Sequence, residues 1–163
     1  MNTPALVLHD AVKASRLAEG LSDEQVGVLA SVLSLESVQP QQVLAREGDA
    51  DNRLYAIVQG SLAIVKHAGT PDETTLVMLG VGDFAHELGF LDGAQRYASL
   101  TAVGPGQVLV LERQGLESLI DTHPRILYSV MCAIVRTVHR VQARLSMQAS
   151  ELTNYIVKQH GRY

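Results

Sequence analysis

One stretch of the chain gathers side chains that suit an anion bound next to a sugar. It runs from Gly82 to Ser99 and contains a short segment, residues 87–91, that favours a helix between loop residues. The free N–H groups and positive dipole end of a helix start suit a phosphate, and Arg96 could add a charge-assisted hydrogen bond. Glu87 could accept a hydrogen bond from a sugar hydroxyl. A small sugar-phosphate site is therefore one interpretation; in the other, Glu87 caps the helix and Arg96 pairs with it on the surface.

The elements around this stretch are short apolar runs separated by turn residues. Six of them are residues 43–45, 54–58, 62–65, 75–79, 98–103 and 107–112. Six to eight short strands with such turns predict an antiparallel barrel or jelly roll. Ahead of them, Ser22 and Gln25 form a capping-box pattern that predicts a helix over 23–34, and residues 4–19 favour a helix that Gly20 ends.

After Arg113 the hydrophobic period becomes helical, first in a short segment and then in a long one. Pro124 is a helix-entry residue, and neither Gly nor Pro recurs before Gly161. Apolar residues then repeat at alternating spacings of four and three: Leu127, Met131, Ile134, Val138, Val141 and Leu145. Gln148, Leu152 and Tyr155 continue the same register, and we call the whole stripe the seam. A helix of roughly 30 residues is about 45 Å long, too long to be buried against a small barrel. The seam predicts a parallel homodimer through residues 124–155.

Composition fits one folded domain with an added element. The 163 residues are 47% hydrophobic and 18% charged, and the net charge of −4 argues against a whole-surface nucleic-acid binder. We expect three parts: an N-terminal helical extension (1–20), a mainly β jelly roll with flanking helices (21–121), and a long dimerisation helix with a tail (122–163). The last part is basic, with six Lys or Arg residues and one acid, Glu151, whereas the rest is acidic.

Several function classes are disfavoured by the sequence. The single Cys132 excludes an internal disulfide framework and a cysteine-ligated zinc site. No apolar run approaches the roughly 18 residues that span a bilayer, and the N-terminus lacks the basic region of a secretory signal, so we expect a cytoplasmic protein. The six histidines form no His-x-His pair, and no nucleophile motif occurs. We therefore expect neither a metal site nor an enzyme.

From about Leu21 to Leu145 the chain resembles the cyclic nucleotide-binding domain of the catabolite activator protein, the Crp/Fnr-type effector domain, and of cyclic-nucleotide-dependent kinase regulatory subunits. The resemblance rests on Arg46-Glu47-Gly48-Asp49, on Leu54-Tyr55-Ala56-Ile57-Val58-Gln59-Gly60, and on a phosphate-binding cassette of Gly82-Asp83-Phe84, Glu87-Leu88 and Arg96-x-Ala98. It implies a jelly roll (double-stranded β-helix), a long helix that pairs in dimers of the bacterial activators, and cAMP or cGMP as ligand without a required cofactor.

The resemblance also implies roles for single residues. Glu87 would bind the ribose 2′-hydroxyl, and Arg96 would hold the cyclic phosphate together with N–H groups near Leu88 and Gly89. His86, Tyr97 and Ala98 complete the candidate site. His86 stands where the family has Gly, and Tyr97 where it has a small residue. These two side chains either point away, or reshape the pocket for a different nucleotide, or fill it.

The long helix carries further candidates. The resemblance implies contacts to the base from this helix, although Val138 and Val141 also fit the seam; the candidates are Arg136, Thr137, Val138, Arg140 and Val141. Arg136, Arg140 and Arg144 share one helix face. That face either contacts a nucleic acid or an acidic partner, or is solvated beside an acidic barrel.

Bacterial activators of the family carry a helix-turn-helix after the long helix, which needs about 70 more residues. A chain complete at Tyr163 would not bind DNA directly; a truncated chain would be the effector domain of a transcription regulator. We expect a stand-alone dimeric domain that senses a nucleotide and signals through its helix to an unknown protein partner. The alternative is a ligand-free dimerisation and interaction module, which Arg96→Ala would affect in local stability alone.

Overall fold

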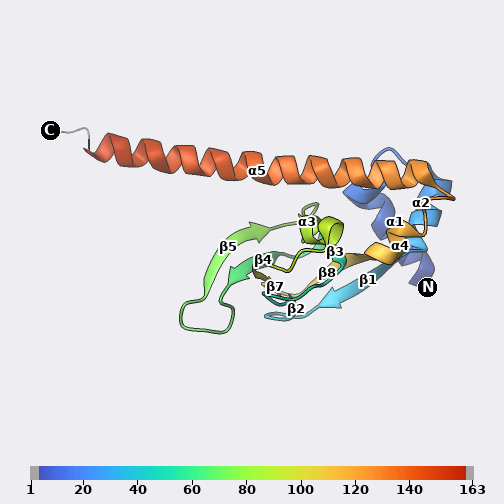
Figure 1. Ribbon diagram of the computed structural model, residues 1–163, viewed down its shortest axis with the longest axis horizontal. Coiled ribbons are helices and arrows are strands. Elements are labelled where there is room, and N and C mark those ends of the chain that lie inside the picture. The colour runs from blue at the N-terminus through green and yellow to red at the C-terminus, as the bar shows by residue number, and fades with distance from the viewer. Residues whose placement is uncertain (1–3, 161–163) are drawn as a thin grey trace.

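The computed structural model describes residues 4–160 and places two antiparallel sheets beneath one long helix (Figure 1). Within that range the strands are β1 (Leu33–Val38), β2 (Val43–Ala45), β3 (Arg53–Gln59), β4 (Leu62–Lys66), β5 (Thr74–Leu79), β6 (Phe84–Ala85), β7 (Ser99–Ala102) and β8 (Gly106–Glu112). One sheet has the order β1-β8-β3-β6 and the other β2-β7-β4-β5. The predicted jelly roll with flanking helices is confirmed.

The two central strands of the first sheet, β3 and β8, are buried on both faces, which explains their unbroken apolar runs. In β3, Leu54 and Ala56 pack against the helices, whereas Tyr55 and Ile57 alternate with them and pack toward the second sheet. Neighbouring residues of a strand point to opposite faces. A strand between two apolar layers therefore lacks the apolar–polar alternation of a half-exposed strand.

The short helices lie mainly at the end of the sheets where the chain begins. They are α1 (Pro4–Ala14), the single-turn η1 (Arg16–Ala18), α2 (Asp23–Ala30), α3 (Glu87–Asp92) and α4 (Arg113–Glu117). The predicted capping box is present, with Ser22 and Gln25 bonding each other's backbone N–H. Two predicted boundaries are wrong: the first helix breaks at Ser15, and the second ends at Ala30 rather than 34. Leu33 instead pairs with Leu111 in the sheet.

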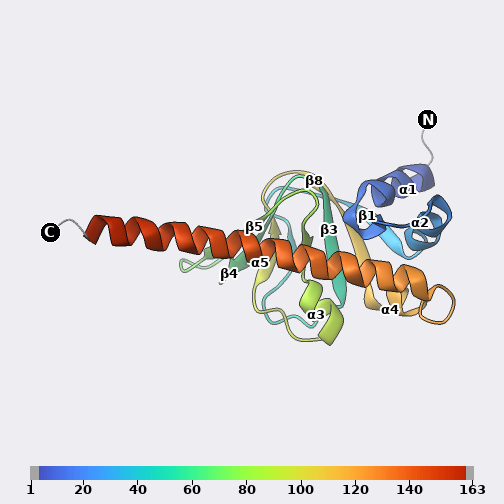
Figure 2. The ribbon, with the colours of Figure 1, turned by 90° about the horizontal axis from the view of Figure 1, so that it is seen from above.

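Helix α5 (Pro124–His160) is 37 residues long and begins at the predicted proline. Its first half packs on the domain through Ile126, Val130 and Ile134, each at most 1% exposed. From residue 142 to 158 every side chain is exposed, and the C-terminal end of the helix projects past the sheets (Figures 1 and 2). The seam is therefore divided, because Ile134 belongs to the core of its own chain. None of the helices described between residues 4 and 160 is long and apolar enough to cross a membrane.

Candidate functional site

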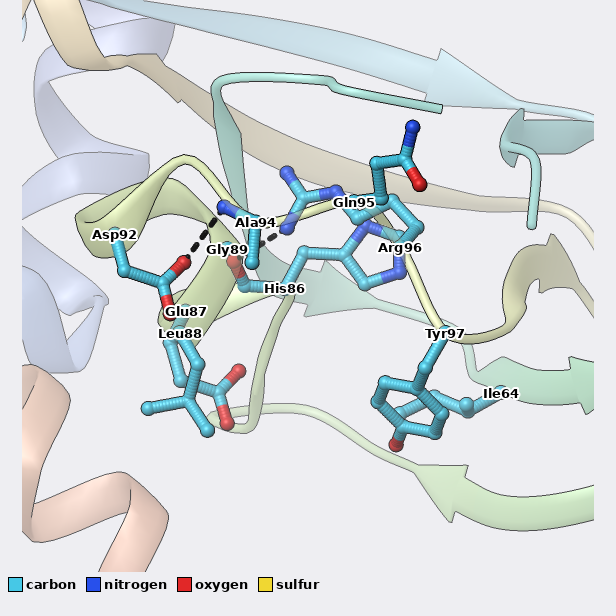
Figure 3. A pocket seen from close by; sticks show the side chains of 10 residues that line it. All are labelled: Ile64, His86, Glu87, Leu88, Gly89, Asp92, Ala94, Gln95, Arg96 and Tyr97. Atoms are coloured by element: carbon cyan, nitrogen blue, oxygen red, sulfur yellow. Dashed lines mark hydrogen bonds between the residues drawn. The ribbon is translucent and has the colours of Figure 1, made fainter. Parts of the chain in front are cut away.

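The predicted cassette forms a pocket of about 290 Å³ between α3, the loop to β7, and β4 (Figure 3). We call it the α3 pocket. Its lining residues are Ile64, His86, Glu87, Leu88, Gly89, Asp92, Ala94, Gln95, Arg96 and Tyr97. Six of the seven predicted site residues are among them. Ala98 is not among them, and it is 1% exposed.

His86 starts α3 with a backbone conformation that favours glycine. Its φ of 66° and ψ of 26° are left-handed, and its side chain makes no capping hydrogen bond. A non-glycine residue in this region costs roughly 1–2 kcal/mol. The backbone thus turns as a glycine would turn it, and an imidazole is added to the lining of the pocket.

Arg96 is buried, with 4% of its surface exposed, and its guanidinium is held by main-chain carbonyls. Nη1 donates to the carbonyl of His86 at 2.9 Å, and Nη2 donates to the carbonyls of Asp51 and, at 3.0 Å, Arg53. Nε has no hydrogen-bond partner among the described residues. The alternative in which Arg96 pairs with Glu87 on the surface is therefore wrong.

A second arginine, Arg113 at the start of α4, also holds α3. Nε of Arg113 donates to the carbonyl of Phe90 at 2.7 Å, and Nη2 donates to the carbonyl of Gly89 at 3.0 Å. A Cβ at Gly89 would collide with Nη1 of Arg96, so the close approach of that guanidinium requires glycine. Nothing in the local sequence around Arg113 signals these contacts, because they join residues more than twenty positions apart.

The imidazole of His86 lies in an apolar and cationic environment. Burial and the nearby charge of Arg96 lower the pKa of His86 to about 4. Its ring stands edge-on to that of Tyr55, with centroids 6.1 Å apart, and its Nδ1 is buried without a hydrogen-bond partner in the described part of the chain. Burial raises the pKa of Glu87. The pocket thus combines a neutral imidazole with one buried guanidinium.

Replacing His86 by Asn should flatten the pH dependence of stability between pH 4 and 6.5. The unfolded chain takes up a proton near the ordinary pKa of 6.5, and the folded one only near about 4, so the stability of the wild type rises with pH across this window. The difference amounts to roughly 3 kcal/mol. Asn tolerates the left-handed backbone but does not titrate.

Urea unfolding across this pH range gives the two slopes. His139→Asn, at an exposed position of α5, is the control and should keep the wild-type slope. Equal slopes in His86→Asn and wild type would show that the imidazole titrates as it does in the unfolded chain.

The candidates on α5 lie outside the α3 pocket. Val138 and Val141 pack against the domain's own core clusters. Thr137 is 1% exposed, and its Oγ1 has no hydrogen-bond partner among residues 4–160. Two arginines of this helix face acids of their own chain. Nη1 of Arg136 lies 3.8 Å from Glu19, and Nη1 of Arg144 lies 3.2 Å from Asp83. These pairs favour the interpretation of the arginine face as lying beside an acidic body. No group of three or more His, Cys, Asp or Glu residues in the described ranges could hold a metal ion.

Known proteins share this architecture and sequence pattern. The cyclic AMP receptor protein of Thermus thermophilus is 26% identical over 140 residues, which cover 86% of this chain and 65% of that protein. The cGMP-dependent protein kinase, isozyme 1, of Drosophila melanogaster is 31% identical over 107 residues, covering 64% of this chain and 14% of the kinase. A solved cyclic nucleotide-binding domain from Methylobacillus flagellatus has a TM-score of 0.75 at 21% identity, covering 95% of this chain and 87% of that one.

The chain spans less than two-thirds of the length of the Thermus relative. The family model described as "Cyclic nucleotide-binding domain" matches residues 35–123. This match is more than half of the chain and contains every residue that lines the α3 pocket. The chain therefore belongs to the cyclic nucleotide-binding domain family.

Proposed function

We propose that this domain is a regulatory module that binds cAMP, cGMP or a related cyclic nucleotide in the α3 pocket and signals through a dimer of α5. The observation that supports the proposal most is the convergence of Glu87, Gly89 and Arg96 on one pocket that also offers an apolar wall. Ligand pockets combine such a wall with a few placed polar groups, and begin at about 300 Å³.

The two ends of the α3 pocket suit the two ends of a nucleotide. Glu87 and Asp92 lie at one end, where carboxylates accept hydrogen bonds from ribose hydroxyls. Tyr97 and Ile64 lie together at the other end (Figure 3), and the Tyr97 side chain is exposed. A base stacked on that ring would gain roughly 1–3 kcal/mol.

Charge in the pocket favours a ligand that carries a single negative charge. Two acidic side chains, Glu87 and Asp92, and one cation, Arg96, line it. The second charge of an open 5′-monophosphate would face the two carboxylates with no further cation, which is unfavourable in a partly buried site. A cyclic monophosphate carries one charge and retains the 2′-hydroxyl. We therefore expect cAMP or cGMP to bind more tightly than 5′-AMP or a cyclic dinucleotide.

The mechanism we propose is a population shift. A ligand that contacts α3 differently in two arrangements of α3 and α5 would bias what the dimer presents to a partner. The relatives' names point to the settings in which such a domain works: one is a receptor protein for cyclic AMP, and another is a cGMP-dependent kinase. In the setting that we propose, the domain acts on its own as a dimer; the alternative setting is the effector part of a transcription regulator.

A second candidate function, a ligand-free interaction module, is favoured by one observation. Three carbonyls already engage the guanidinium of Arg96. In that case the α3 pocket would be a structural remnant, and the exposed half of α5 would provide the interaction surface.

Calorimetric titration of the full chain with cAMP, cGMP, 5′-AMP and a cyclic dinucleotide separates the two candidates. Glu87→Gln should weaken cyclic-nucleotide binding about tenfold, because a hydrogen bond to a charged acceptor contributes roughly 1.5 kcal/mol. Glu117→Gln removes the same charge at an exposed position outside the pocket and should leave the affinity unchanged. Flat titrations with all four ligands on folded protein would support the interaction module instead.

A further inference from the structure

The two residues that depart from the family's pattern lie in different parts of the α3 pocket. Tyr97 is 62% exposed and lies at the rim beside Ile64. The imidazole of His86 lies deeper, alongside the Arg96 side chain (Figure 3). Of the two, His86 is the one that lies beside the Arg96 side chain (Figure 3).

Arg96 lines the α3 pocket and is nevertheless almost inaccessible, at 4% exposure. Its two terminal nitrogens are engaged by carbonyls, one of them that of His86 itself. The remaining donor, Nε–H, is buried and has no partner in the part of the chain that the structure describes. A buried donor without a partner costs roughly 1–3 kcal/mol. The Arg96 guanidinium therefore has a donor free for an anion, but the surrounding atoms keep an anion from reaching it.

The imidazole of His86, like the guanidinium of Arg96, has a buried polar atom without a partner among the described residues. Nδ1 of His86 is buried without a hydrogen-bond partner among the described residues, and the backbone of His86 is held left-handed. The ring contacts Tyr55 edge-on, a contact of about 1 kcal/mol. This contact and the burial of the ring favour its position inside the pocket, so free energy must be supplied to swing the ring out.

We propose that His86 is a gate on the α3 pocket: its imidazole covers Arg96 and has to leave before an anion reaches the guanidinium. The proposal rests on the proposed function for the identity of the anion, a cyclic phosphate. A ligand must supply the free energy that moves the ring, so the apparent affinity falls by the fraction of molecules with an open gate. The gate would set a high threshold concentration for the signal.

His86→Gly tests the gate because it removes the ring and relaxes the backbone while keeping its conformation. It should bind cAMP or cGMP about tenfold or more tightly than wild type in calorimetry, the reverse of the loss expected if the imidazole contacts the ligand. Tyr97→Ser places a small residue at the other position that differs from the family's pattern. It is the matched control and should not tighten cyclic-nucleotide binding. Equal affinities of wild type and His86→Gly, or weaker binding by the variant, would overturn the gate while leaving the proposed function intact.

A readout without ligand separates failure of the gate from failure of the proposed function. Exchange of the Arg96 Nε–H with water, followed by ¹⁵N NMR and assigned by the loss of its signal in Arg96→Lys, should be faster in His86→Gly than in wild type. If neither wild type nor His86→Gly binds a cyclic nucleotide, but Nε–H exchange is faster in His86→Gly, then the imidazole does cover Arg96 and the proposed ligand class is wrong. If exchange is unchanged, the imidazole does not cover Arg96 and the gate is refuted.

Discussion

Replacing Arg96 by alanine should lower the free energy of unfolding by about 3–5 kcal/mol, because a buried side chain is lost and three partly buried carbonyls lose a donor at once. These carbonyls belong to His86, Asp51 and Arg53. Arg96 thereby joins the start of α3 to the start of β3, which is 43 positions away for Arg53. A domain is stable by roughly 5–15 kcal/mol, so the variant is expected to fold but to be marginal.

Urea unfolding of Arg96→Ala against Arg53→Ala provides the measurement and its control. The Arg53 side chain belongs to the same cluster but is 46% exposed and lies 3.7 Å from Glu112 and 3.9 Å from Asp51. Exposed ion pairs contribute about 0–1 kcal/mol, so this control should lose little. A loss below about 1 kcal/mol in Arg96→Ala would mean that water replaces the guanidinium at no cost.

This structural role changes how binding data on Arg96 are to be interpreted. If Arg96 only held the cyclic phosphate, Arg96→Ala would abolish nucleotide binding and leave the dimer intact. In the structure, the same substitution also releases α3, so loss of binding follows from a missing phosphate contact or from a displaced helix. Glu87→Gln is the sharper test of ligand binding, because the Glu87 side chain accepts no hydrogen bond from a distant element in the described chain.

The strands and the position of the α3 pocket were predictable because they follow from local patterns. Apolar runs of strand length between turn residues define the sheets, and the order of Glu87 and Arg96 places the cassette. What could not be predicted depends on distant contacts. Residues 31–34 continue the pattern of a helix, yet Leu33 becomes a strand residue because β8 offers it a partner. The partners of Arg96 and Arg113 likewise lie on other elements.

The long helix shows the same limit in another form. A repeat of apolar residues at spacings of four and three predicts that one face of the helix is buried. It does not predict whether the same domain or a second helix buries that face. Ile134 and Tyr155 occupy equivalent heptad positions in the seam, yet the first is 1% exposed in its own domain and the second is 62% exposed. The start of α5 therefore uses its apolar face for the fold, and the distal half leaves that face open to solvent.

Leu145→Arg combined with Leu152→Arg should convert the proposed dimer to a monomer. The two leucines lie one heptad apart on the projecting half of α5 and are 40% and 62% exposed. In a parallel pair of helices each would meet its own copy, and burying a leucine contributes about 1.5–3 kcal/mol. Losing four such side chains, with like charges brought together, should weaken association at least a hundredfold.

Sedimentation velocity of the double variant over a range of concentrations measures this change. Ala143→Arg with Ser150→Arg is the matched control, since it adds the same charge at the same spacing on the opposite side of the helix, where both residues are exposed; it should remain dimeric. The unfolding free energy of the domain should change little in either variant at concentrations where it is monomeric, because Ile126, Val130 and Ile134 keep their contacts. Dissociation of both variants, or a wild type that is monomeric throughout, would refute pairing through the seam, and signalling through a symmetric pair of helices would then be excluded.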